Sequence, residues 1–204
     1  GDHRDLHSFP TRRSSDLLIR HGEAKVMEND APLTKKGLEQ SKAVAQRLKN
    51  YEFDEIFCSD LTRAKQTCEE YLKLTNKKAN YTEDLREIYR VIVGGSEKEG
   101  TSEGREERDK KIADQIFNQL SSKKGKNILI FTHGNLIRYF ITKSTNFDPK
   151  KSWDGLELHP SSISIINFEN EKTTIKTINS ISHLPKEEKE SFFSKEKIDQ
   201  DYLP

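Results

Sequence analysis

Two short apolar runs that each end in His-Gly constrain the fold of this chain more than any other feature. The first is Leu-Leu-Ile-Arg-His-Gly at positions 17–22, and the second is Ile-Leu-Ile-Phe-Thr-His-Gly at positions 128–134. Both runs are too short for a helix, and their apolar residues and closing glycines favour strands. Open α/β sheets bind ligands at the edge where their parallel strands end. We therefore expect His21 and His133 to lie at the carboxyl edge of one sheet.

Segments with helical periodicity alternate with these two strands. Residues 34–49 carry apolar residues at helical spacing behind Thr34, a residue type that often caps a helix N-terminus. The other predicted helices are 61–74, 105–120 and 136–143, and the other predicted strands are 53–58, 80–82, 163–168 and 173–177, the last two as a hairpin. This alternation predicts an α/β fold, a three-layer α/β/α sandwich with a mostly parallel central sheet and a late antiparallel hairpin.

The chain of 204 residues is long enough for one domain with short extensions. Residues 1–16 lack periodicity, and positions 7–17 resemble the conceptual translation of a sequencing-library adapter, so we expect a non-native or disordered leader over 1–16. The domain itself is expected over residues 17–184. Residues 185–204 are charged and aperiodic and are expected to form a flexible tail.

The charge balance limits the classes of partner. Lys and Arg number 35 against 34 Asp and Glu, and the net charge of +1 provides no overall field for nucleic acid or an acidic membrane. No apolar run approaches the roughly 18 residues of a membrane span. The spacing of Cys58 and Cys68 fits no metal or redox motif, and free thiols are typical of a reducing compartment. We therefore expect a cytoplasmic protein without nucleic-acid or membrane partners. With so small a net charge, any anionic ligand would have to be bound by a local cluster of positive side chains.

Four dispersed segments carry the candidate chemistry. They are Arg-His-Gly-Glu at 20–23, Ser-Asp-Leu-Thr-Arg-Ala-Lys-Gln-Thr at 59–67, Leu-Arg-Glu at 85–87 and Thr-His-Gly-Asn at 132–135. In this order and spacing they resemble the histidine phosphatase superfamily, also called phosphoglycerate-mutase-like. The resemblance implies the same layered α/β fold that the alternation of helices and strands predicts.

The resemblance also implies roles for the charged residues of these segments. His21 would attack phosphorus and carry the phosphoryl group as phosphohistidine. Arg20 and Arg63 would hold the phosphate oxygens with forked donors, and His133 would add a donor on the transferring oxygens. No cofactor is implied. No metal is implied either, because guanidinium groups beside the two histidines would repel a dication.

An acid is needed to protonate the leaving oxygen. Glu87 matches the acid–base residue of the family, in which a leucine stands two positions earlier. Glu83, Asp84 and Glu103 lie nearby in the sequence and remain alternatives for this role. Asn135 is expected either to line the phosphate pocket or to cap the helix that follows it.

Two features bear on the branch of the family. The residues after Glu87 lack the His-Tyr-Gly pattern of the cofactor-dependent mutases, which favours hydrolysis. Residues 128–185 most resemble the Ser/Thr protein phosphatases of the mitochondrial phosphoglycerate-mutase type, with the phosphohistidine phosphatases as the nearest competitor. The predicted activity is therefore hydrolysis of a phosphomonoester, with a protein side chain as its carrier.

Two other functions stay open. One is mutase-type phosphoryl transfer on a small metabolite, and the other is a non-catalytic phosphate-binding module. The expected partner is a phosphorylated protein or a small phosphomonoester, and homodimer formation is left open as well.

Overall fold

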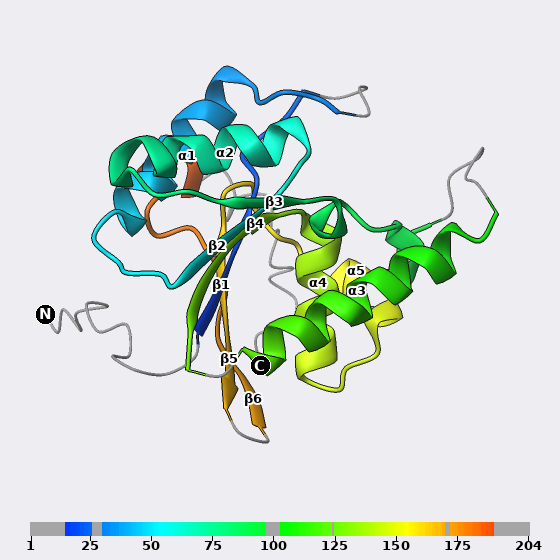
Figure 1. The fold of residues 1–204 in the computed structure, drawn as a ribbon. Coiled ribbons are helices and arrows are strands. Elements are labelled where there is room, and N and C mark those ends of the chain that lie inside the picture. The colour runs from blue at the N-terminus through cyan, green and yellow to red at the C-terminus, as the bar shows by residue number, and fades with distance from the viewer. Residues whose placement is uncertain (1–14, 26–29, 97–102, 124, 170–171, 190–204) are drawn as a thin grey trace, which may run out of the picture.

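The computed structural model of the chain describes residues 15–25, 30–96, 103–123, 125–169 and 172–189 (Figure 1). Its strands are β1 (Ser15–Arg20), β2 (Glu55–Ser59), β3 (Asn80–Thr82), β4 (Asn127–Thr132), β5 (Ile163–Glu169) and β6 (Lys172–Ser180). Its α-helices are α1 (Lys35–Leu48), α2 (Thr62–Thr75), α3 (Arg105–Ser122), α4 (Gly134–Ser144) and α5 (Ser152–Gly155). Three short 3-10 helices are η1 (Glu83–Leu85), η2 (Arg90–Val93) and η3 (Pro149–Lys151).

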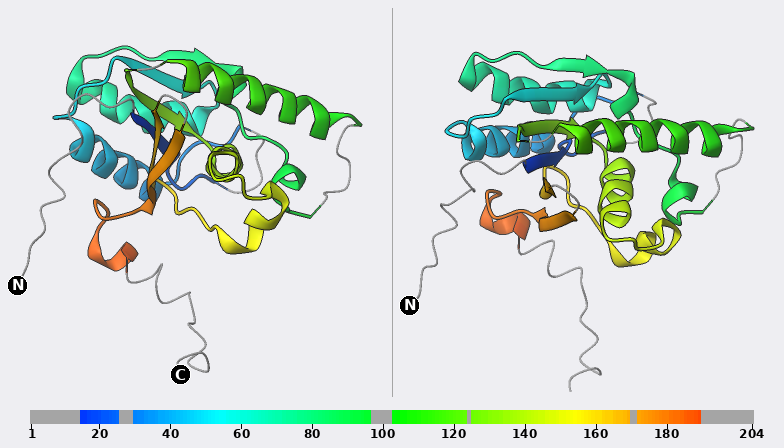
Figure 2. Two further views of the ribbon diagram at one scale, coloured as in Figure 1. Left: turned by 90° about the horizontal axis from the view of Figure 1, so that it is seen from below. Right: turned by 60° about the horizontal axis from the view of Figure 1, so that its bottom comes forward.

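The described strands form one mixed six-stranded sheet in the order β3-β2-β4-β1-β5-β6. The first four of these run parallel, whereas β5 pairs antiparallel with β1 and β6 pairs antiparallel with β5. Helices α1 and α2 cover one face of the sheet, and α3, α4 and α5 lie on the other (Figures 1 and 2). This arrangement confirms the predicted α/β/α sandwich with its late antiparallel hairpin.

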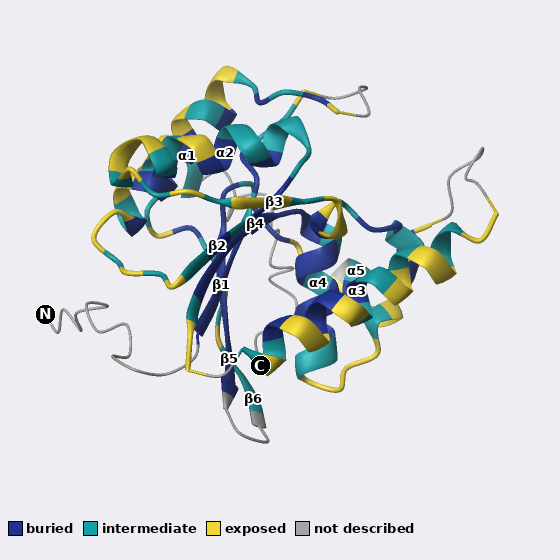
Figure 3. Ribbon diagram, viewed as in Figure 1, coloured by how far each residue is buried: buried dark blue, intermediate teal, exposed yellow. Residues whose placement is uncertain are grey.

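The side chains of β4 alternate between two hydrophobic clusters. Ile128 and Ile130 face the cluster formed with α3 and α4, whereas Leu129 and Phe131 face the cluster formed with α1 and α2. Because successive side chains of a strand point to opposite faces, a strand that is covered on both sides is apolar throughout. This explains the unbroken apolar run in the sequence, and the central strands are the most continuously buried part of the ribbon (Figure 3).

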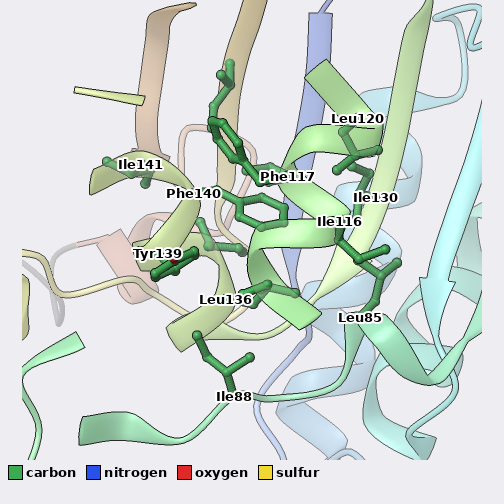
Figure 4. Packing of buried hydrophobic residues seen from close by; sticks show 14 of the residues in the cluster. Leu85, Ile88, Ile116, Phe117, Leu120, Ile130, Leu136, Tyr139, Phe140 and Ile141 are labelled. Carbon is green, nitrogen blue, oxygen red and sulfur yellow. The ribbon is translucent and has the colours of Figure 1, made fainter. Parts of the chain in front are cut away.

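Aromatic packing joins α3 and α4 above the sheet. The rings of Phe117 and Phe140 meet edge to face with their centroids 5.6 Å apart, in a cluster that also contains Leu136 and Ile116 (Figure 4). Such edge-to-face pairs contribute about 0.5–1.5 kcal/mol beyond the area that they bury. The pair fixes α4, and α4 in turn carries residues of the candidate site at its N-terminus.

Helix α1 begins where the sequence predicts and presses against the turn after β1. The hydroxyl of Thr34 accepts the N–H of Gly37 at 3.0 Å, as an N-cap does. A Cβ on Gly37 would lie 2.0 Å from the carbonyl oxygen of Glu23, and a Cβ on Gly22 would lie 2.5 Å from the carbonyl oxygen of Gly37. The two glycines therefore permit a backbone contact that no side chain would fit.

The domain begins earlier than the predicted strand. β1 starts at Ser15, so Ser15 and Asp16, the last residues of the expected leader, already pair with β4 and β5. Residues 1–14, the rest of that leader, lie outside the described residues.

The expected tail also starts with residues that contact the domain. Residues 186–189 form a helical turn, and Glu188 accepts a hydrogen bond from Nε2 of Gln40 at 2.5 Å. The side-chain oxygen of Gln40 accepts the N–H of Glu23 at 2.8 Å, which ties this turn to the loop after β1. Residues 190–204 lie outside the described residues, and across the described part of the chain no helix has the length and apolar character needed to span a membrane.

Asp16 places a carboxyl group inside the hydrophobic sheet. Its strand neighbours are Ile128 of β4 and Ile166 of β5, and its Oδ2 has no hydrogen-bond partner among the described residues. Burial raises the pKa of Asp16 well above its ordinary value, against the opposing charge of Lys123. We expect Asp16→Val to raise the free energy of unfolding at pH 7 by about 1–3 kcal/mol, the usual cost of an unpaired buried polar group.

The pH dependence gives this expectation its sign. A carboxyl whose pKa is raised in the folded state favours the folded state at low pH, and this contribution is lost as pH rises through the raised pKa. The difference in the free energy of unfolding between Asp16→Val and the wild type should therefore be largest at neutral pH and shrink on acidification. Urea unfolding at several pH values measures this difference. Asp16→Asn is the control: it should remove the pH dependence but recover only part of the stability. A variant no more stable than the wild type at pH 7 would contradict the assignment.

Candidate active site

The two His-Gly turns meet because β1 and β4 are parallel neighbours in register. Arg20 pairs with Thr132 at the end of the two strands, and the N–H of His21 donates to the carbonyl of Thr132 at 3.0 Å. The rings of His21 and His133 consequently lie 5.1 Å apart, tilted by 60°. The structure thus brings together the two histidines that the sequence places at one sheet edge.

Hydrogen bonds fix the proton of His21 on one ring nitrogen. Nδ1 lies 2.7 Å from the carbonyl oxygen of Gly22, which can only accept, so Nδ1 carries the proton. Nε2 accepts from Nε–H of Arg63 at 3.1 Å, so its lone pair faces the site. Burial, followed by the charge of Arg20, lowers the pKa of His21 to about 3. His21 is therefore a neutral imidazole at neutral pH, with Nε2 ready to attack.

The peptide that follows His21 is held from two sides. The N–H of Gly22 donates to the hydroxyl of Thr67 at 3.0 Å, and that hydroxyl donates to the carbonyl of Arg63 at 2.8 Å. Thr67 lies one turn after Arg63 on α2, so the same helix positions the guanidinium and the turn that carries His21. The motif at 59–67 owes its spacing to this double contact.

Arg20 and Arg63 supply the positive charge of the site. Arg20 donates from one terminal nitrogen to the carbonyl of Leu158, while its buried Nε has no partner among the described residues. Burial lowers the pKa of both guanidinium groups, yet arginine does not lose its proton in proteins. The site thus contains one unpaired guanidinium N–H, on Arg20, and a second that donates to Nε2 of His21.

His133 is fully buried beneath the same site. Its Nε2 lies 2.8 Å from the hydroxyl of Ser59, and its Nδ1 has no partner among the described residues. Burial, then the neighbouring His21, Arg63 and Arg20, lower the pKa of His133 well below its ordinary value. His133 is therefore also neutral, and one of its ring nitrogens is free for a phosphate oxygen.

Glu87 closes the site at the N-terminus of α4. Its Oε1 accepts the N–H of Asn135 at 2.8 Å, one of the backbone donors that a helix start leaves unpaired. Burial raises the pKa of Glu87, against the lowering effects of Arg20, the Asn135 N–H, Arg63 and Arg138. A raised pKa is what a carboxyl group needs if it is to deliver a proton near neutral pH.

The three alternative acids differ from Glu87 in their exposure to solvent. Glu83 is exposed and pairs with Arg86 at 3.3 Å, and Asp84 and Glu103 are exposed as well. Arg86 also forms a bidentate pair with Asp60, at 2.7 and 2.5 Å. This position of the charges supports Glu87 as the acid among the four carboxylates.

Asn135 was expected to line the phosphate pocket or cap its helix, but its contacts are with the loop that follows β3 and with Arg138 of its own helix. Its backbone N–H holds Glu87, its Nδ2 donates to the carbonyl of Ile88 at 3.2 Å, and its Oδ1 accepts from Arg138 at 2.9 Å. In this structure the side chain holds the Glu87–Ile88 segment, and a phosphate contact by Asn135 remains a prediction.

Sequence reasoning missed Arg138 as a residue of the site. It stands three positions after Asn135 on α4, a spacing that brings two side chains together on one face of a helix. Its guanidinium also stacks over Trp153, 4.8 Å from the ring centroid. The helical spacing was visible in the sequence, and Trp153 was expected to pack against this helix, but its contact with Arg138 was not predicted.

A cavity of about 510 Å³ lies beside Glu87, and neither His21 nor His133 is among its lining residues. It is lined by residues of the η1 region and the start of α3, namely Glu83, Asp84, Arg86, Glu87, Ile88, Arg105, Arg108, Asp109 and Ile112. Ile112 of α3 is only half-buried, since it lines this cavity. In the described part of the chain, no three His, Cys, Asp or Glu side chains are grouped so that they could hold a metal ion.

A profile of the histidine phosphatase superfamily (branch 1) matches residues 17–119 and 96–181. The chain belongs to the histidine phosphatase superfamily, and it is a phosphatase of this metal-independent class. The predicted resemblance is thereby confirmed for the superfamily.

Two curated relatives cover most of the chain. It is 28% identical over 197 residues to the uncharacterized phosphatase PhoE of Bacillus subtilis, an alignment that covers 82% of this chain and 95% of PhoE. It is 29% identical over 192 residues to the mitochondrial serine/threonine-protein phosphatase Pgam5 of Drosophila grimshawi, covering 86% of this chain and 66% of Pgam5. PhoE is named only as a phosphatase and Pgam5 as a serine/threonine-protein phosphatase, so the two relatives together indicate the superfamily and not one branch of it.

Solved structures of low identity share the fold. A phosphoserine phosphatase of Entamoeba histolytica, solved with 3-phosphoglyceric acid, has a TM-score of 0.70 at 24% identity and covers 84% of this chain and all 100% of its own. The α-ribazole phosphatase of Shigella flexneri has a TM-score of 0.66 at 20% identity and covers 81% of this chain and 96% of its own. Both confirm the phosphoglycerate-mutase-like fold.

Proposed function

We propose that this protein hydrolyses phosphomonoesters through a phosphohistidine on Nε2 of His21, and that its substrate is a phosphorylated protein side chain. The observation that carries the mechanism is the pair of contacts on His21. Gly22 holds the proton on Nδ1, and the Nε2 lone pair faces a guanidinium at 3.1 Å. A nucleophile with cations around it is what a dianionic phosphate monoester requires.

In the first half of the reaction the substrate phosphate takes the place of Nε2 as the partner of Arg63. Arg20 and His133 hold its other oxygens, and Nε2 attacks phosphorus while the bond to the leaving oxygen breaks. Glu87 gives its proton to that oxygen, which leaves as an alcohol. His21 now carries the phosphoryl group and Glu87 is ionised.

In the second half a water molecule replaces the product. Glu87 takes a proton from this water as its oxygen attacks phosphorus, and the bond from phosphorus to Nε2 breaks. The products are inorganic phosphate, a neutral His21 and a protonated Glu87. The site therefore returns to its starting state without any other reactant.

The protein substrate is supported by similarity rather than by the site. The Pgam5 relative is named as a serine/threonine-protein phosphatase, and its alignment extends over 86% of this chain. The cavity beside Glu87 is lined by charged side chains of both signs, which suits a polar leaving group. A phosphohistidine side chain is the alternative within the protein substrates.

A panel of substrates tests this proposal. Wild type and His21→Ala would be assayed, with chelator present, on p-nitrophenyl phosphate, a phosphothreonine peptide, a phosphohistidine peptide and 3-phosphoglycerate. We expect wild-type hydrolysis of a peptide with kcat/KM at least about tenfold above that for 3-phosphoglycerate, a difference of about 1.4 kcal/mol.

The other functions have their own signatures in the same panel. Isomerisation of 3-phosphoglycerate that 2,3-bisphosphoglycerate stimulates would identify a mutase. Phosphate binding without turnover on any substrate would identify a binding module, and the proposed hydrolysis would then be wrong.

A further inference from the structure

Arg138 is a half-buried cation whose direct partners are all uncharged. Its Nε donates to the carbonyl of Leu156 at 2.7 Å, its terminal nitrogen donates to Oδ1 of Asn135 at 2.9 Å, and its face lies over Trp153. None of the ion pairs found among the described residues includes Arg138. Burial lowers the pKa of this guanidinium, so enclosing its charge has a cost that neutral acceptors do not fully offset.

Asn135 links this cation to the acid. Arginine can only donate and a carbonyl can only accept, so the two contacts of the Asn135 side chain define its orientation: Oδ1 toward Arg138 and Nδ2 toward Ile88. The backbone N–H of the same residue holds Oε1 of Glu87 at 2.8 Å. Asn135 therefore contacts both Glu87 and the next residue, and Arg138 fixes the orientation in which it does so.

The guanidinium of Arg138 is also held by its contact with the aromatic ring of Trp153. Two guanidinium groups contact the ring of Trp153, with Arg138 at 4.8 Å and Arg90 at 5.7 Å from its centroid. Only Arg138 of these two also reaches Asn135. The two arginines thus form a natural pair for comparison, since they share Trp153 and differ in their contact with Asn135.

We propose that Asn135 and Arg138 form a clamp that positions Glu87 as the acid of the reaction, with Arg138 acting as a positioning residue through Asn135. The proposal rests on the function proposed above, because it assumes that Glu87 delivers a proton. The clamp places the carboxyl of Glu87 at the start of α4. It also adds a nearby positive charge, which lowers the pH up to which Glu87 keeps its proton.

Arg138 is one of several groups that influence the ionisation of Glu87. Arg20 of β1, Arg63 of α2 and the N–H of Asn135 also lower the pKa of Glu87, against the effect of its burial. The charged groups around the adjacent cavity are Glu83, Asp84, Arg86, Arg105, Arg108 and Asp109. Removing Arg138 alone leaves the other charged side chains in place, so a change in the ionisation of Glu87 reports the loss of Arg138, either of its charge or of its contact with Asn135.

The test compares Arg138→Met with Arg90→Met on two substrates across a range of pH. We expect Arg138→Met to lower kcat/KM for a phosphothreonine peptide about tenfold more than for p-nitrophenyl phosphate, whose leaving group needs little protonation. The alkaline limb of the peptide profile, where Glu87 loses its proton, should move to higher pH. Arg90→Met should change neither the ratio of the two substrates nor the position of the limb.

A second variant separates charge from geometry and guards against loss of folding. Arg138→Lys retains the charge but has one nitrogen in place of the two that donate to Leu156 and Asn135, so it should restore the alkaline limb while leaving part of the selective loss on the peptide. Equal losses on both substrates with an unmoved limb in Arg138→Met would reduce Arg138 to a structural residue and overturn the proposal.

The failure of the clamp can be told apart from the failure of the proposed function by including Glu87→Gln. If Glu87→Gln affects the peptide selectively and Arg138→Met does not, the clamp alone is wrong. If Glu87→Gln shows no selectivity, Glu87 is not the acid, and the clamp is overturned together with that assignment.

Discussion

Replacing His21 with alanine is expected to lower kcat by more than about 10⁴-fold and to remove the acid-labile phosphoenzyme, because the variant lacks the attacking atom. Since burial and Arg20 lower the pKa of His21 to about 3, the imidazole stays neutral between about pH 5 and pH 8. Phosphoenzyme formation by the wild type should therefore persist into mildly acidic solution. Rapid-quench labelling with a ³²P-labelled substrate measures both the rate and the label.

His133 is the matched control, since its ring lies 5.1 Å from that of His21. It is also neutral and buried, but Ser59 lies against its Nε2. We expect His133→Ala to slow labelling while still forming an acid-labile phosphoenzyme. If His133→Ala lost the label and His21→Ala retained it, the nucleophile would be His133.

The meeting of the two histidines could be predicted because it depends on strand order alone. A parallel pair with equivalent ends brings the residues after Arg20 and Thr132 together whatever their side chains do. Helix α1 was equally predictable, since the Thr34 cap is a contact between residues three positions apart. Local spacing accounts for the start of α1, and parallel pairing accounts for the two histidines at the edge of the sheet.

The contacts of Asn135 could not be predicted in the same way. Its side chain reaches Ile88, a residue 47 positions away whose loop has no periodicity, and the sequence gives no direction for a side chain at a helix start. Glu188 presents the same difficulty, because its bond to Gln40 joins residues 148 positions apart through a segment that reads as solvated. Contacts of this range depend on how the loops fold back, which composition and spacing do not encode.

At Asp16 the prediction from the sequence and the structure disagree. A polar residue there reads as part of the leader, yet its backbone continues β1 between Ile128 and Ile166. The strand extends to Ser15 because its neighbours offer backbone partners, which do not depend on side-chain type.

Replacing Glu87 with glutamine is expected to lower kcat/KM for a phosphothreonine peptide by about 10²–10⁴-fold, the range that general acid catalysis contributes. Glutamine retains an oxygen that can accept the N–H of Asn135, so the loop keeps its position while the acidic proton is lost. The loss on p-nitrophenyl phosphate should be much smaller.

The pH profile gives the same assignment a second, independent measurement. Because burial raises the pKa of Glu87, the wild type should keep its acid protonated to higher pH than an ordinary glutamate would, and activity on the peptide should fall as pH rises through that raised pKa. Glu87→Gln should lack this limb because it has no proton to lose. Glu83→Gln is the control, since Glu83 is exposed and paired with Arg86, and it should retain both the limb and the activity. A limb that disappears in Glu83→Gln and remains in Glu87→Gln would transfer the acid role to Glu83, and would place proton delivery on the cavity side of the loop rather than at the start of α4.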